Sequence, residues 1–119
     1  MKKIVVVGLL MVSFFAGKAQ SIKFSGSICN ERINLNWSID SNEATYMFEV
    51  ERSFDGTSFS LAALVFTSEK KGKDEYRFFE SMKSTAKVYY RIKKYSNNGE
   101  INYSNMICLT VKNEEKQTE

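Results

Sequence analysis

Apolar and polar residues alternate along most of this chain with a period of two, which is the pattern of β-strands that bury one face. The clearest run begins at Ile33, from which apolar residues at every second position alternate with polar ones as far as Ile39. The other expected strands are residues 22–28, 46–52, 59–66, 76–78, 88–92 and 103–111. The pattern therefore predicts about seven short strands.

Two of the connections carry strong turn signals. Asp55-Gly56 and Asn98-Gly99 each follow a strand, and both dipeptides suit the positive φ angles of tight turns. Residues 59–66 are ambiguous because their centre could form a helical turn, but the short length favours a strand. No long amphipathic helix is expected beyond residue 20. The predicted fold class is all-β, as a two-sheet antiparallel sandwich.

Two bulges and one inward-pointing aromatic residue are expected within these strands. Gly26 favours a bulge in the first strand. Tyr46 is expected to point inward, in parity with the apolar residues that follow it. Lys94 also has inward parity, so a bulge near Lys93 is expected to turn Lys94 outward and Tyr95 inward.

Residues 1–19 have the three-part pattern of a secretory signal peptide. Two lysines precede an apolar stretch at residues 4–16, and residues 17–19 end in a small residue suited to cleavage. Cleavage leaves Gln20 first and places the protein in the periplasm, at the cell surface or outside the cell. A retained membrane anchor is the alternative, although the apolar stretch is shorter than the roughly 20 residues that span a bilayer.

Loss of the signal peptide changes the charge of the protein. It removes three of 17 basic residues and no acidic one, which leaves 14 of each. This balance argues against nucleic acid as a partner, and no further segment is long and apolar enough for membrane insertion. Residues 20–112 suffice for one small domain, and the polar residues 113–119 are expected to form a disordered tail.

Several phrases in the sequence point to one family of modules. They are Ile33-Asn-Leu-Asn-Trp37, Phe48-Glu-Val-Glu-Arg-Ser53, Asp55-Gly56, Phe59, Tyr89-Tyr-Arg-Ile-Lys93, Gly99 and Tyr103-Ser104. Together they resemble the fibronectin type III-like modules of bacterial exported proteins, which fold as an immunoglobulin-like sandwich. Modules of this kind are found beside type IX secretion sorting domains. The resemblance implies the fold and export, and it implies no particular activity.

The resemblance also implies structural roles for two aromatic residues. Trp37 would lie at the centre of the core on the second strand. The hydroxyl of Tyr90 would bond to the backbone at a strand crossing, as in a tyrosine corner. A sugar-stacking role for Trp37 is the functional alternative.

Cys29 and Cys108 are the only cysteines in the chain. They fall on the first and last expected strands, both with outward parity, and an exported protein meets conditions in which disulfides persist. We expect a disulfide between them. Two free thiols are the alternative, because parity alone does not bring the two Cα atoms within about 7 Å of each other.

The sequence gives no support for catalysis. The chain has no histidine, which removes the commonest general base and most zinc sites. Glu49 and Glu51 share one strand face, where we expect them to pair with Arg91 and Lys93 across the outer sheet. We therefore predict a protein that is not an enzyme and that uses neither cofactor nor metal.

A contact face is the remaining candidate site. Met47, Tyr89 and Met106 are expected to cluster on the outer sheet beside Glu49 and Arg91, and an exposed apolar patch with polar neighbours marks many protein contact surfaces.

The expected function is a non-catalytic protein-interaction or accessory module of the cell envelope or surface, with an envelope or extracellular protein as its partner. A carbohydrate-binding or adhesion module is the first alternative, for which Phe79 is the isolated aromatic candidate. A purely structural envelope component is the second.

Overall fold

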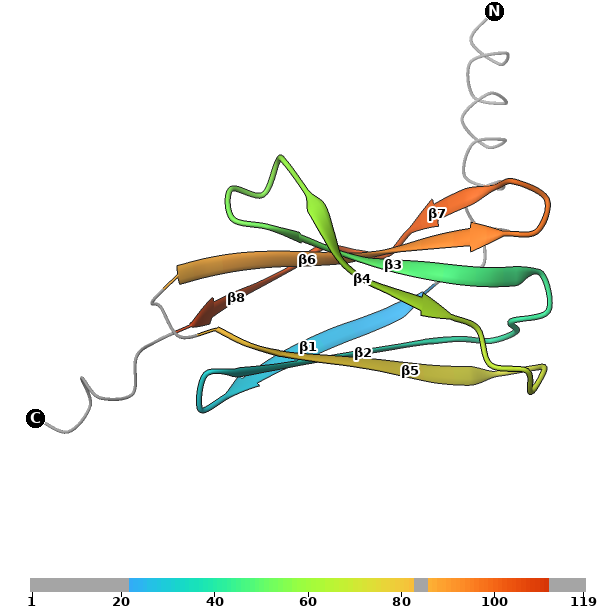
Figure 1. Cartoon of the computed structure of the whole chain (residues 1–119), viewed down its shortest axis with the longest axis horizontal. Helices are drawn as coiled ribbons and strands as arrows, with labels where there is room; N and C mark the ends of the chain where they lie inside the picture. The colour runs from blue at the N-terminus through green and yellow to red at the C-terminus, as the bar shows by residue number, and fades with distance from the viewer. Residues whose placement is uncertain (1–21, 83–85, 112–119) are drawn as a thin grey trace, which may run out of the picture.

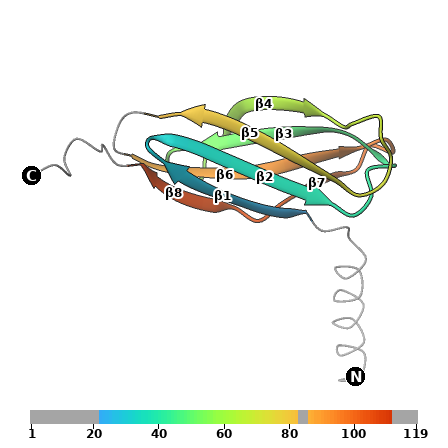
Figure 2. The same cartoon turned by 90° about the horizontal axis from the view of Figure 1, so that it is seen from below.

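The computed structural model describes residues 22–82 and 86–111, which form two antiparallel sheets packed face to face (Figure 1). The three-stranded sheet has the order β1-β2-β5, and Figure 2 looks onto it. The five-stranded sheet has the order β4-β3-β6-β7, and β8 also pairs with β6. The predicted all-β, two-sheet sandwich is confirmed.

The strands have the following bounds. In the three-stranded sheet they are β1 Lys23–Cys29, β2 Arg32–Ile39 and β5 Asp74–Ser81. In the five-stranded sheet they are β3 Thr45–Ser53, β4 Ser60–Phe66, β6 Ala86–Ser96, β7 Ile101–Tyr103 and β8 Ile107–Val111. The ambiguous segment at residues 59–66 is therefore a strand.

The core fills the space between the two sheets. Trp37 packs edge-on against Phe48, with ring centroids 5.8 Å apart, and stacks on Tyr76 at 5.9 Å. Tyr90 lies in the same core with none of its surface exposed. The buried apolar residues are Ile22, Phe24, Ile33, Leu35, Trp37, Ile39, Phe48, Val50, Tyr76, Val88, Tyr90, Ile92 and Val111.

Positive φ angles occur where the turn signals predict them. Gly56 has φ +79° and Gly99 has φ +93°. A third turn was not predicted: Asn30 and Glu31 connect β1 to β2 with φ angles of 52° and 67°. Two successive residues with positive φ are the signature of a type I′ hairpin turn, which asparagine accepts more readily than glutamate.

Gly26 does not form the predicted bulge, because β1 pairs with β2 in one continuous register. A Cβ atom added at Gly26 would lie 2.7 Å from the side chain of Leu35 and 2.8 Å from that of Ile107. Glycine at this position therefore allows β1 and β8 to approach each other closely at the edge of the core.

The bulge predicted near Lys93 is also wrong, because the irregularity lies on the partner strand. The register of β3 with β6 shifts between Thr45 and Met47, so Thr45 is buried and Tyr46 is 45% exposed. Lys94 keeps its inward parity and is 2% exposed. Burial lowers the pKa of the Lys94 ammonium group.

The single strand expected at residues 103–111 is divided in two. At the break, the backbone N–H of Ser104 donates to the carbonyl of Ile92 at 2.9 Å. The Ser104 hydroxyl in turn accepts the N–H of Ile92 at 2.8 Å, in place of a backbone carbonyl. The interruption changes the parity, so Tyr103 is 49% exposed although it was expected to point inward with Ile107.

The predicted signal peptide at residues 1–19 and the predicted tail at residues 113–119 lie outside the described residues. Within residues 22–82 and 86–111, no helix is long and apolar enough to cross a bilayer.

Candidate functional site

The outer face of the five-stranded sheet carries a ladder of ion pairs. Glu49 lies opposite Lys93 and Glu51 opposite Arg91 in the register of β3 with β6. The Arg91 Nε atom is 2.7 Å from Glu51 Oε1, and the Lys93 Nζ atom is 3.9 Å from Glu49 Oε1. The predicted pairing of these four residues is confirmed.

Aromatic rings enclose the Arg91 end of this ladder. The guanidinium carbon of Arg91 lies 4.0 Å from the ring centroid of Phe59 and 4.5 Å from that of Tyr103. The two rings and the Glu51 carboxylate hold the guanidinium in one place. Two members of the predicted contact face, Arg91 and Glu49, are thus engaged within the protein itself.

The apolar members of the predicted contact face do not form one cluster. Met47 and Tyr89 both lie on the outer face, but Met47 pairs with Tyr95 whereas Tyr89 pairs with Ser53. Tyr89 and Tyr95 are six positions apart on β6, which corresponds to roughly 20 Å along a strand. Met106 precedes β8 and is 50% exposed. The structure brings these residues to one face but not together.

A loop of the protein itself packs beside Tyr89. A Cβ atom added at Gly56 would lie 3.4 Å from the Tyr89 ring. Asp55 Oδ1 fixes this loop by accepting hydrogen bonds at 2.8 Å from the backbone of Ser58 and Thr57 and from the Ser53 hydroxyl. These bonds lower the pKa of the Asp55 carboxyl group, the one from Ser58 most strongly.

A different apolar set on the same sheet is more exposed. Leu61, Leu64 and Phe66 of β4 are 52%, 48% and 67% exposed, and we call these three residues the β4 apolar row. They lie opposite Glu51, Glu49 and Met47 in the register of β3 with β4. The sequence signal for this row was the absence of charged residues from residues 59–66. Periodicity could not show which residues of this segment face outward.

The position of β4 makes this row more conspicuous. β4 is an edge strand of the five-stranded sheet, and it contains neither a charged residue nor proline. Edge strands usually carry such residues because their unpaired backbone groups can otherwise pair with another chain. β4 therefore lacks both of these protections, and its pairing with β3 contains one register shift, between Val50 and Glu51.

A polar cluster joins the two sheets across the core. One Arg52 nitrogen, Nη1, lies 2.7 Å from Oε1 and 2.9 Å from Oε2 of Glu80 on β5. The hydroxyl of Tyr90 donates to the same carboxylate. The predicted bond from Tyr90 to the backbone is therefore wrong. Burial, and secondarily the hydrogen bond to Glu80, raise the pKa of the Tyr90 hydroxyl.

The predicted disulfide between Cys29 and Cys108 is not formed. Both cysteines are free and exposed, although β1 and β8 lie side by side in both views (Figures 1 and 2). Cys29 points outward from the three-stranded sheet and Cys108 outward from the five-stranded sheet. Because the outer faces of the two sheets look in opposite directions, a shared outward parity turns the thiols away from each other.

The described part of the chain contains no group of three acidic, histidine or cysteine side chains arranged to hold a metal ion. Neither a protein family nor a curated protein matches the sequence.

Among solved structures, the fold is similar to that of the pectate lyase Pel3 from Pectobacterium carotovorum, with a TM-score of 0.59 and 18% sequence identity. The match covers 74% of this chain and 26% of that chain, so this chain corresponds to about a quarter of the lyase. At this identity the likeness shows the fold alone and does not establish enzymatic function either way.

Proposed function

We propose that this protein is a non-catalytic, fibronectin type III-like module that works outside the cytoplasm by binding another protein through the β4 edge. Export is supported by the signal-peptide pattern of residues 1–19. The absence of histidine and the ion pairs of Glu49 and Glu51 support a role without catalysis.

The order of the strands supports the fibronectin type III-like assignment. In an immunoglobulin constant-type sandwich the fourth strand pairs with the fifth, whereas here β4 pairs with β3. Trp37 on β2 and Tyr90 on β6 are both buried at the positions that the family resemblance implies.

The observation that carries the proposed contact is the β4 apolar row on an edge strand that has neither a charged residue nor proline. Leu61, Leu64 and Phe66 expose about half or more of their surface, and the strand carries no charge. An extended segment of a partner can pair with such an edge through its backbone while its apolar side chains cover the row. The proposed partner is therefore an exported protein that presents a strand with apolar residues at alternate positions.

Substitution of the row by threonine tests this proposal. Leu61→Thr, Leu64→Thr and Phe66→Thr together keep strand-forming residues on β4 while removing apolar contact area. We expect crosslinked capture of the partner from native cells to fall at least tenfold, with the melting temperature nearly unchanged because the side chains are exposed. Capture is quantified by mass spectrometry of the eluate.

The matched control changes Ile101 and Met106 to threonine. Ile101 lies on β7 and Met106 directly precedes β8, and the two residues are 46% and 50% exposed. The control variant should capture the partner as the unsubstituted protein does. Equal capture by the β4 variant and the unsubstituted protein would reject the β4 edge as the contact. If the purified protein dimerises in a concentration-dependent way and the β4 variant does not, the occupant of the β4 edge is a second copy of this chain rather than another protein.

A further inference from the structure

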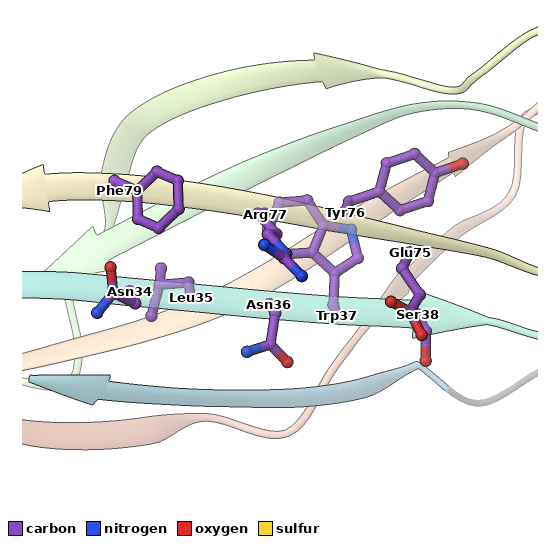
Figure 3. A pocket seen from close by; sticks show the side chains of 9 residues that line it. All are labelled: Asn34, Leu35, Asn36, Trp37, Ser38, Glu75, Tyr76, Arg77 and Phe79. Atoms are coloured by element: carbon purple, nitrogen blue, oxygen red, sulfur yellow. The ribbon is translucent and has the colours of Figure 1, made fainter.

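The outer face of the three-stranded sheet, opposite to the β4 apolar row, carries an open hollow of about 570 Å³ (Figure 3). This volume lies within the range of about 300 to 1,000 Å³ that is typical of small-molecule sites. The side chains of Leu35, Trp37 and Tyr76 are buried, so these residues contribute the floor. The walls are the outward side chains Asn34, Asn36, Ser38, Glu75, Arg77 and Phe79.

Strand pairing fixes the positions of these side chains. Asn36 lies opposite Arg77, and Asn34 lies opposite Phe79, in the register of β2 with β5. Directly paired residues on one face have Cβ atoms about 4.5 to 5.5 Å apart. Figure 3 shows the two rows running side by side along β2 and β5. The hollow is therefore lined by polar groups on rigid strands rather than on loops.

Most polar side chains of this hollow have no partner within the described part of the protein. Within the described residues, the side chains of Arg77, Asn34 and Glu75 make neither a hydrogen bond nor an ion pair with another residue. Only Asn36 is engaged, accepting a hydrogen bond of 3.1 Å from Ser25. The opposite face differs, because its charged ladder residues are all paired. The hollow therefore offers a ligand donors and acceptors that are not engaged with other protein groups.

Phe79 adds one apolar surface to the wall. Its side chain is 47% exposed, and the guanidinium of Arg32 lies 4.7 Å from its ring centroid. An aromatic ring beside amide and guanidinium groups matches a pyranose, which has hydroxyls at its rim and an apolar C–H face. A peptide that adds a strand would bind at a free strand edge, such as that of β5, whereas the hollow lies on the face of the sheet.

The charges on this face favour an acidic ligand. Its outward residues include Lys23, Arg32 and Arg77 against Glu75 alone. The planar guanidinium of Arg77 can donate two parallel hydrogen bonds to a carboxylate. We propose that the hollow binds a uronic-acid saccharide, with Arg77 on a carboxylate, Asn34 and Asn36 on hydroxyls, and Phe79 against a sugar ring. This site goes beyond the proposed protein contact and lies on the other sheet.

Nuclear magnetic resonance titration of the purified protein tests the site. The probe is a hexamer of galacturonic acid, and the neutral comparison is cellohexaose. We expect the acidic hexamer to shift the backbone amide signals of residues 34–38 and 75–79, and we expect the affinity to fall as salt is raised. Cellohexaose should bind at least tenfold more weakly.

Four variants make the titration decisive. Arg77→Gln and Phe79→Thr should each weaken binding of the acidic hexamer at least tenfold. Lys87→Gln removes one exposed charge from the opposite sheet and should leave the affinity unchanged. The β4 variant should also keep full saccharide affinity, which separates this site from the protein contact.

Three outcomes would overturn the proposal. They are the absence of signal shifts at millimolar hexamer, shifts confined to residues outside the hollow, and an equal loss of affinity in the Arg77→Gln and Lys87→Gln variants. Equal or tighter binding of cellohexaose would overturn the assignment of an acidic ligand.

Discussion

At the scale of single residues, the cluster of Arg52, Glu80 and Tyr90 connects the two sheets by polar contacts. The Glu80 carboxylate accepts hydrogen bonds from both partners, and Tyr90 is fully buried. This hydrogen bond stabilises the fold most when the tyrosine hydroxyl is protonated and the carboxyl group is ionised. The stability of the protein should therefore depend on pH in the alkaline range.

Substitution of Tyr90 by phenylalanine tests this dependence. The folded state holds the Tyr90 proton beyond the pH of about 10 at which the unfolded chain releases it. Stabilisation by this group is therefore complete below pH 10 and declines as pH rises above it, because only the unfolded chain then ionises.

Tyr90→Phe should lower the free energy of unfolding by about 1 to 3 kcal/mol at pH 7. It should also reduce the alkaline decline in stability. Part of the decline should remain, because burial also raises the pKa of Tyr76. Urea unfolding at intervals from pH 7 to 11 measures both effects. An identical alkaline slope in the two proteins would contradict this role for Tyr90.

At the scale of elements, alternation located the strands, whereas the bulges depend on contacts between strands. The inward parity of Lys94 could be read from the sequence. The position of the irregularity could not, because the register of β3 with β6 shifts at Tyr46 on the partner strand. The break at Ser104 depends on its hydroxyl meeting the Ile92 N–H. The β4 apolar row was missed for the same reason, since the exposed side of β4 is set by its pairing with β3.

The hairpin between β1 and β2 provides a prediction at this scale. Glu31 has φ +67°, in the left-handed region that disfavours a residue with a Cβ atom. Glu31→Gly should raise the free energy of unfolding by about 0.5 to 1 kcal/mol, because glycine relieves this strain. Denaturant unfolding measures the change. Glu31→Ala is the control, since it removes the carboxylate but keeps the Cβ atom. A gain of the same size in the alanine variant would assign the effect to charge.

At the scale of the whole molecule, the outer faces of the two sheets carry different kinds of side chains. The five-stranded sheet combines paired charges with an exposed apolar edge, and the three-stranded sheet presents polar groups around a hollow. The sequence predicted the sandwich and the charge ladder, because both follow from alternation within strands. The predicted disulfide was wrong because parity within a strand does not say in which sheet the strand lies.

Hydrogen exchange of the protein, free and in complex with its captured partner, tests the central claim most directly. Pairing of a partner strand with the β4 edge should slow exchange of backbone amides within residues 60–66, because these groups gain hydrogen bonds. Exchange at residues 101–103 on the opposite edge of the same sheet should stay unchanged. Slowed exchange at residues 101–103, with no change at residues 60–66, would contradict the β4 edge as the binding surface.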